Sequence, residues 1–140
     1  MAITTLEAAI LKVVNIVKAV DGVKAAPDYL PDSVYQYPMA ICRPGAGTWE
    51  YGPGFGNKLG LHTIIVELMV PYKDMARDVQ KLCDFLDMIP NAIMTDPTLG
   101  ATVNTIGTIR TDGIVGMIYN GMDMLAIRWY IDNVKLITAY

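Results

Sequence analysis

The chain has 140 residues, of which 53% are apolar and 18% are charged, and its formal net charge is −3. This length suits one domain that buries its own core, and we expect residues 1–140 to form it. The acidic balance lacks the basic footprint of nucleic-acid binding, and no apolar run approaches the ~20 residues that span a bilayer. Because the charged fraction is below the usual ~25%, we expect other subunits to cover part of the surface, with a monomer that has a large core as the alternative.

The first predicted element is a helix near the N-terminus. Its apolar positions recur every three or four residues and form one stripe, which consists of Leu6, Ile10, Val13, Val17 and Val20. Gly22 is a natural residue to follow the helix end. The rest of the circumference is also poor in charge, so we expect burial on more than one side, by the sheet or by a neighbouring copy. A loop over residues 23–33 and a first strand over residues 34–43 come next.

Residues 44–57, PGAGTWEYGPGFGN, contain five glycines and two prolines. This composition predicts a long hairpin loop without regular structure. The loop nevertheless carries three large aromatic side chains, those of Trp49, Tyr51 and Phe55. Two interpretations stay open: the loop folds over its own core, or it is an assembly arm that becomes ordered against a partner. The phosphate-loop pattern G-x-x-x-x-G-K-[ST] is missing from this stretch.

The centre of the chain predicts a strand, a helix and a turn. Alternation over residues 61–70 gives the strand an apolar face made of Ile64, Val66, Leu68 and Val70. The helix starts after Asp74, and its apolar stripe consists of Met75, Val79, Leu82, Leu86 and Ile89. We expect Pro90 to end this helix, because proline lacks the amide hydrogen that a helix interior needs. Residues 95–100, TDPTLG, then turn the chain towards the next strand.

The C-terminal third predicts an antiparallel meander. We expect strands over residues 101–110, 114–119 and 122–136, joined by turns at Asp112-Gly113 and Asn120-Gly121. Together these elements predict a two-layer α+β domain. It would have an antiparallel or mixed sheet of about five strands, packed against two main helices and carrying the long glycine-rich hairpin loop.

Side chains for catalysis are scarce. The chain has one histidine, His62, and one serine, Ser33, and its 14 carboxylates are scattered without the spacing of an acid–base pair. We expect Cys42 and Cys83 to be reduced, buried thiols. One histidine and two distant cysteines cannot assemble a metal site. The sequence therefore predicts a protein that is no enzyme and holds no metal or cofactor.

The order of the elements and two short motifs resemble a known family. The motifs are Ile89-Pro90-Asn91-Ala92-Ile93 and Asp96-Pro97-Thr98-Leu99-Gly100, supported by Pro44-Gly45 at the end of the first predicted strand. The chain resembles, over nearly its whole length, the tail terminator (tail completion, or minor tail) proteins of long-tailed bacteriophages. The family often has a second glycine after Leu-Gly, where this chain has Ala101.

The resemblance implies an α+β subunit that assembles into a hexameric ring at the head-proximal end of the phage tail tube. Such a ring stops tube polymerisation and offers a docking surface to the head–tail connector, while DNA passes through it without specific binding. The implied location is the virion tail, after assembly in the host cytoplasm. Pro90, Asp96, Pro97 and Gly100 would have a structural role in the turn.

Two alternatives stay open. One is a neck or head-completion adaptor of the same kind of particle. The other is a small intracellular binding module or enzyme that uses the 44–57 loop as a lid. Self-association distinguishes this last class from the first two.

Overall fold

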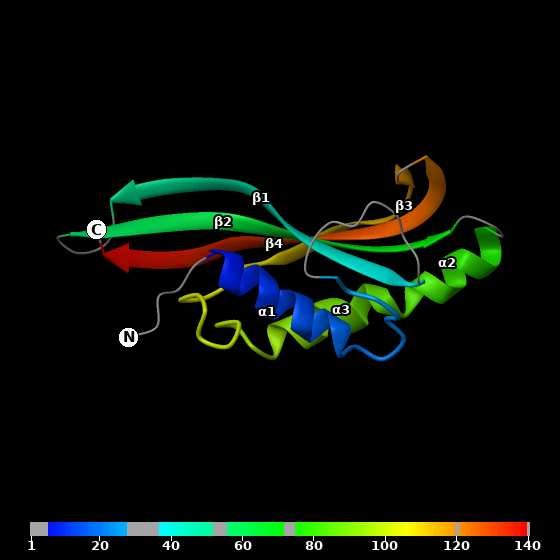
Figure 1. Ribbon diagram of the computed structural model, residues 1–140, viewed down its shortest axis with the longest axis horizontal. Coiled ribbons are helices and arrows are strands. Elements are labelled where there is room, and N and C mark those ends of the chain that lie inside the picture. The colour runs from blue at the N-terminus through cyan, green and yellow to red at the C-terminus, as the bar shows by residue number, and fades with distance from the viewer. Residues whose placement is uncertain (1–5, 28–36, 52–55, 72–74, 120, 140) are drawn as a thin grey trace.

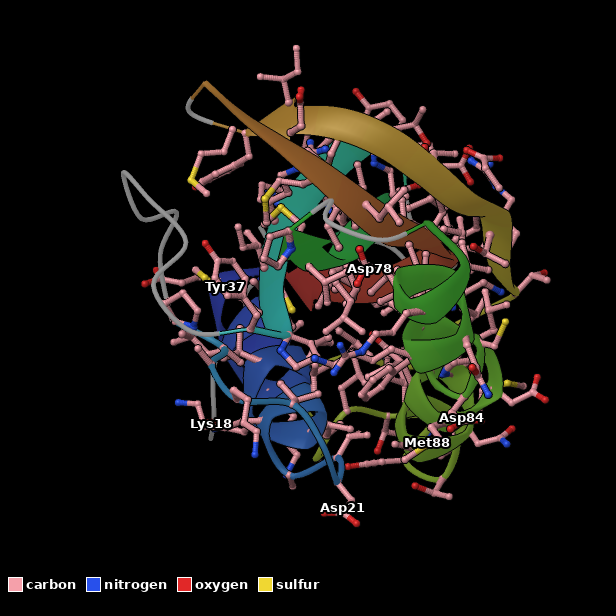
Figure 2. All side chains as sticks on the ribbon, turned by 90° about the vertical axis from the view of Figure 1, so that its right-hand side faces the viewer. Lys18, Asp21, Tyr37, Asp78, Asp84 and Met88 are labelled. Atoms are coloured by element: carbon pink, nitrogen blue, oxygen red, sulfur yellow. The ribbon has the colours of Figure 1, made fainter. Side chains whose placement is uncertain are left out.

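A computed structural model describes residues 6–27, 37–51, 56–71, 75–119 and 121–139. They form three helices, α1 (Leu6–Lys18), α2 (Met75–Cys83) and α3 (Phe85–Met94), and four strands, β1 (Met39–Tyr51), β2 (Asn57–Pro71), β3 (Ile109–Tyr119) and β4 (Met122–Ala139). The strands make one antiparallel sheet in the order β1-β2-β4-β3. The helices all lie on one face of this sheet (Figure 1), and seen end-on α1 lies beside α2 and α3 (Figure 2). The predicted two-layer α+β fold is confirmed.

The main core lies between the sheet and the helices. Strand β2 contributes the predicted face, and β4 contributes its own alternating face, so that the sheet side of the core consists mainly of Ile64, Val66, Leu68, Val70, Leu125, Ile127, Trp129 and Ile131. The helix side consists mainly of Ala9, Val13, Val14, Val17, Leu82, Phe85, Ile89 and Ile93. Helix α1 contacts both β1 and α3. Its predicted burial on more than one side is therefore supplied within the chain itself.

The opposite face of the sheet holds a smaller apolar cluster of Ala25, Met39, Ile41, Met69, Met124 and Ala126. Beside it, the carboxylate of Glu67 is buried on the central strand and contacts an arginine on each neighbouring strand. Its Oε1 lies 2.7 Å from Nη2 of Arg43 on β1, and its Oε2 lies 3.1 Å from Nη2 of Arg128 on β4. A carboxylate removed from water requires such charged partners, so Glu67 ties three strands together.

Both strands next to β2 bulge at the same row. Gly45 and Ala46 of β1 lie opposite Thr63, where the β1–β2 register shifts. The β2–β4 register shifts at the same residue, opposite Asp132 and Asn133. An extra residue on one strand bends the sheet and resets which face the following side chains occupy. Consequently Ile131 and Val134 are both buried in the core although they are three residues apart.

The predicted boundaries of the central helix are wrong at two places. The helix is divided at Asp84 into α2 and α3, and it continues past Pro90 to Met94. Proline at this position removes one hydrogen bond of the helix. However, Ile89 and Ile93 on either side of it are fully buried, and most helical stability in proteins comes from such packing.

The sheet has four strands and not about five, because two predicted strands merge. Asp112-Gly113 is a bulge inside β3 and not a hairpin turn: the register with β4 shifts between Thr111 and Ile114, and Gly113 has a φ of +87°. Residues 101–108, predicted to be strand, are turns with one isolated bridge between Thr105 and Lys135. Both halves of β3 pair with the same long partner, β4, so the chain has no reason to reverse at Gly113.

The predicted glycine-rich loop is wrong over much of its length, since residues 44–51 belong to β1 and Asn57 begins β2. Residues 52–55 lie outside the described part of the chain. Cross-strand pairing of Trp49 with Gly60 and of Tyr51 with Lys58 gives this segment its regular structure. Composition alone suggested a loop because glycine and proline usually interrupt strands.

The turn after α3 places Gly100 and both of its neighbours in the left-handed backbone region. Leu99, Gly100 and Ala101 have φ values of +48°, +65° and +65°. The turn is closed by main-chain hydrogen bonds, with the amide of Leu99 donating to Asp96 O at 3.0 Å and the amide of Val103 donating to Thr98 O at 3.2 Å. It buries the Leu99 side chain completely in the core.

The two positions in this turn predict stability changes of opposite sign. Gly100→Val places a β-branched residue in the left-handed region, so we expect a loss of about 1–3 kcal/mol in the free energy of unfolding. Ala101→Gly relieves the same conflict at the next residue, and after the entropy of a new glycine we expect a gain of up to about 1 kcal/mol. Urea unfolding of both variants measures these changes. Two shifts of the same sign would show that backbone conformation does not control this turn.

The burial of Glu67 predicts a stability loss on removal of its charge. Glu67→Gln leaves Arg43 and Arg128 without a carboxylate, and because both arginines keep about a third of their side-chain exposure we expect a loss of about 1–3 kcal/mol. Glu50→Gln, on an exposed position of the same sheet, is the matched control and should change stability by less than about 0.5 kcal/mol. Equal effects of the two substitutions in urea unfolding would contradict the role of Glu67.

Candidate assembly surface

The sheet extends beyond the helices at one end (Figure 1). We call residues 47–51 of β1 and 57–62 of β2 the arm. They pair antiparallel, from Gly47 with His62 to Tyr51 with Lys58, and β4 continues the pairing on the other side of β2. The arm starts immediately after the row of bulges at Thr63. The bulges therefore mark the boundary between the packed part of the sheet and the part that projects.

Two glycines leave the space that the His62 side chain occupies in the arm. A β-carbon built on Gly47 would lie 2.6 Å from Nδ1 of His62, and one built on Gly60 would lie 2.7 Å from its Nε2. Both distances are too short for real atoms, so the imidazole occupies space that only glycines leave open. His62 is 7% exposed, and the edge-to-face partner of its ring is Trp49, with ring centroids 5.2 Å apart at 75°. Glycine in this segment serves close packing.

Trp49 and Tyr51 lie on β1 and point outward. Their side chains are 71% and 87% exposed, the highest values among the large apolar residues of the described chain. Large exposed aromatic side chains are typical of interfaces. Phe55, the third predicted arm residue, lies outside the described residues. The structure thus brings Trp49 and Tyr51 together on one strand face, already ordered by strand pairing.

The predicted turn residues lie in and after α3. Pro90 is inside the helix, and Asp96, Pro97 and Gly100 form the turn that follows it. A β-carbon at Gly100 would lie 2.9 Å from Cε of Lys12, which places the turn against α1. These residues therefore shape the helical layer and are distinct from the arm.

A second exposed apolar surface was not predicted from the sequence. We call residues 114–119 of β3 and 122–126 of β4 the tip, which lies at the end of the sheet opposite the arm (Figure 1). Ile118 is 70% exposed and Met122 is 43% exposed. In the sequence both residues look like ordinary members of alternating strands. Ile118 pairs with Asp123 and lies on the helix side of the sheet, whereas Met122 pairs with Tyr119 and lies on the opposite face, so cross-strand register decides where each is exposed.

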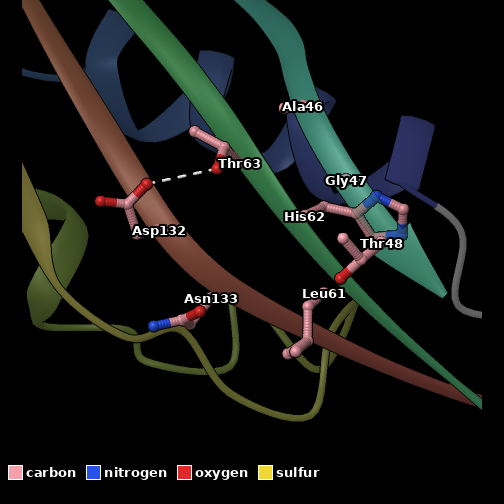
Figure 3. A pocket seen from close by; sticks show the side chains of 8 residues that line it. All are labelled: Ala46, Gly47, Thr48, Leu61, His62, Thr63, Asp132 and Asn133. Carbon is pink, nitrogen blue, oxygen red and sulfur yellow. Dashed lines mark hydrogen bonds between the residues drawn. The ribbon is translucent and has the colours of Figure 1, made fainter. Parts of the chain in front are cut away.

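A polar network crosses the sheet face that is turned away from the helices. Thr63 Oγ1 donates to Asp132 Oδ1 at 3.2 Å, and Arg110 Nε donates to Asp132 Oδ2 at 2.7 Å (Figure 3 shows the first of these). The Arg110 guanidinium lies 4.1 Å from the centre of the Tyr130 ring. A shallow depression of about 360 Å³ adjoins Thr63 and Asp132. The Asp132 carboxylate already accepts hydrogen bonds from Thr63 and Arg110. We therefore interpret the network as fixing strand register and not as a ligand site.

Reactive groups do not gather at one place in the described residues. Groups of three or more histidine, cysteine, aspartate or glutamate side chains close enough to hold a metal ion are not found there. Burial raises the pKa of the Cys42 thiol to about 12, so it stays protonated. Cys83 is exposed, which corrects the prediction that both thiols are buried. None of the described helices is long and apolar enough to cross a membrane.

Comparison with models of known protein families finds no match, and a search of curated proteins finds none either. The functional assignment of this chain therefore depends on the geometry described above and on the resemblance of its motifs.

Burial of His62 predicts that acid weakens the fold. Burial lowers the pKa of His62 from its ordinary value of 6.5, so the unfolded chain binds a proton more readily than the folded chain. This contribution to stability is complete above about pH 6.5 and is lost as the pH falls through the lower pKa of the folded state. A single proton limits the slope to about 1.4 kcal/mol per pH unit.

The measurement is urea unfolding of the wild type and of His62→Gln between about pH 5 and pH 8. We expect the free energy of unfolding of the wild type to fall more steeply towards acid than that of His62→Gln, because the variant has no imidazole to protonate. Parallel pH profiles for the two proteins would mean that the His62 environment does not oppose protonation.

Proposed function

We propose that this chain is a structural virion protein of the tail-terminator type. In this proposal, copies assemble into a ring, hexameric as the resemblance implies, at the head-proximal end of a phage tail tube. The ring stops tube polymerisation and offers a docking surface to the head–tail connector. DNA passes through it without specific binding, consistent with a net charge of −3. The protein would act as a binding surface and not as an enzyme.

The observation that supports this proposal most is the exposed aromatic pair on the arm. Trp49 and Tyr51 are more than two-thirds exposed, yet strand pairing holds their backbone in place. Ordering a free segment of backbone costs roughly 1–2 kcal/mol per residue. A surface that is ordered in advance avoids most of this cost on binding. Burial of each aromatic side chain against a partner then contributes on the order of 1.5–3 kcal/mol.

The motif that carries the family resemblance also has a definite structural role. Leu99 is fully buried, and the three-residue left-handed turn around Gly100 brings the chain from α3 against α1. Such a turn requires particular residues, so its sequence is more informative than an exposed loop of the same length. The turn supports the proposed family because its left-handed backbone conformation restricts which residues can occupy it.

The proposal predicts control of tube length. In this proposal, the tail-tube subunit of the same phage should form long tubes alone and shorter, capped tubes when this protein is added. Trp49→Ser combined with Tyr51→Ser should leave the fold intact, since both side chains are exposed, and should weaken capping by about tenfold or more. Electron microscopy of tube lengths is the measurement. Met94→Ser, which removes another exposed apolar side chain on α3, is the matched control.

Tube lengths that do not change on addition of the wild-type protein would contradict a terminator function. If the protein then bound the isolated head–tail connector, the neck-adaptor alternative would replace it. Capping by the wild type that persists in the Trp49 and Tyr51 variant would instead remove the arm from the mechanism while keeping the terminator function.

A further inference from the structure

The arm and the tip lie at opposite ends of one sheet (Figure 1). Each belongs in part to an outer strand, β1 for the arm and β3 for the tip. Each carries a large exposed apolar side chain, Trp49 with Tyr51 on the arm and Ile118 on the tip. With two such surfaces at opposite ends, the arm of one copy can contact the tip of the next copy.

The tip has room for an aromatic side chain. A groove of about 310 Å³ lies there, lined by Gly116, Met117, Ile118, Asp123 and Met124. Nothing lies within 4 Å of the position that a β-carbon on Gly116 would occupy. Benzene binds in an apolar cavity of about 150 Å³, so this groove is large enough for a single aromatic ring.

The chemistry of the two surfaces is complementary on the helix side of the sheet. Strand pairing places Lys58 directly beside Tyr51 on the arm and Asp123 directly beside Ile118 on the tip. The tip has one acidic residue, Asp123, and no lysine or arginine, whereas the arm has Lys58 on this face and Glu50 on the opposite face. Contact between two tips would bring carboxylates together, and contact between two arms would bring lysines together. Contact between an arm and a tip brings opposite charges together.

We propose that the arm of one copy docks on the tip of a second copy of this chain, with Trp49 or Tyr51 in the groove beside Gly116 and Lys58 near Asp123. The contact rests on the proposed function in one respect, namely that copies of the chain associate. Because two different surfaces meet, the contact is heterologous. Each copy keeps one free arm or tip, so association continues until a ring closes or a filament grows.

Two variants separate the two halves of the contact. The arm variant combines Trp49→Ser with Tyr51→Ser, and the tip variant is Ile118→Ser. All three positions are exposed, so both variants should fold. Sedimentation should show the wild type as a closed oligomer and each variant alone as a monomer at the same concentration. The concentration for half-association should rise at least about tenfold in each.

The decisive sample is a mixture of the two variants. The arm variant still has a working tip, and the tip variant still has a working arm. Their mixture should form a one-to-one dimer that grows no further, because the remaining arm and tip are both defective. Met94→Ser is the control for loss of an exposed apolar side chain and should assemble like the wild type.

Charge reversal gives a second test that does not remove apolar surface. Lys58→Glu and Asp123→Lys should each weaken association, and the chain with both substitutions should recover it, because the arm charge and the tip charge are then opposite again. The recovery should be smaller at high salt, where exposed charges are screened. Failure of the double substitution to recover association would overturn the pairing of these two residues.

Each outcome bears on the contact and on the ring separately. An oligomer that persists in both variants would overturn the contact while the ring stands. A tip variant that assembles normally beside a monomeric arm variant would show that arms dock on another surface. Filaments with a one-to-one dimer in the mixture would support the contact and contradict the ring. A wild type that stays monomeric at its highest soluble concentration would overturn both.

Discussion

Strand β2 is the constraint on which the rest of the structure depends. It is paired on both sides along most of its length, and from Ile64 to Val70 it is buried on both faces. Since a central strand cannot shift without breaking two ladders, its neighbours accommodate every irregularity. Both do so opposite Thr63, where β1 and β4 each add a residue. Two bulges in one row bend the sheet together, and this divides the molecule into a packed half and an arm.

The arm shows how glycine supports a defined structure. Gly47 and Gly60 leave the space that the His62 ring fills, and the ring in turn contacts the edge of Trp49. This contact fixes one aromatic side chain while most of its surface stays open to water. A side chain held in this way loses less conformational entropy when a partner covers it. Order in the free subunit and exposure to a partner are therefore compatible in this segment.

In the helical layer, the turn after α3 returns the chain to the sheet. The turn places three consecutive residues in the left-handed region, at a cost of about 1–2 kcal/mol for each residue that has a β-carbon. Complete burial of Leu99 contributes about 1.5–3 kcal/mol, and the hydrogen bonds to Asp96 O and Thr98 O add to it. Packing of this one leucine thus offsets most of the backbone strain around it.

Sequence by itself determined the features that depend on neighbours along the chain. The alternation of β2, the apolar stripes of the helices and the Gly100 turn are local patterns, so the α+β class and most core residues followed from them. The aromatic content near Trp49 also distinguished this segment in the sequence, but composition predicted a loop that becomes ordered against a partner, whereas residues 44–51 belong to a paired strand.

Only the tertiary structure decided the features that depend on pairing between distant segments. The bulges at Thr63 and Gly113, the merging of two predicted strands into β3, and the partners of Glu67 are set by cross-strand register, which no local pattern encodes. Helix α3 continues through Pro90 because Ile89 and Ile93 meet a core built from other elements. The exposure of Ile118 at the tip likewise depends on where the helical layer ends, and that boundary is a property of the packed molecule.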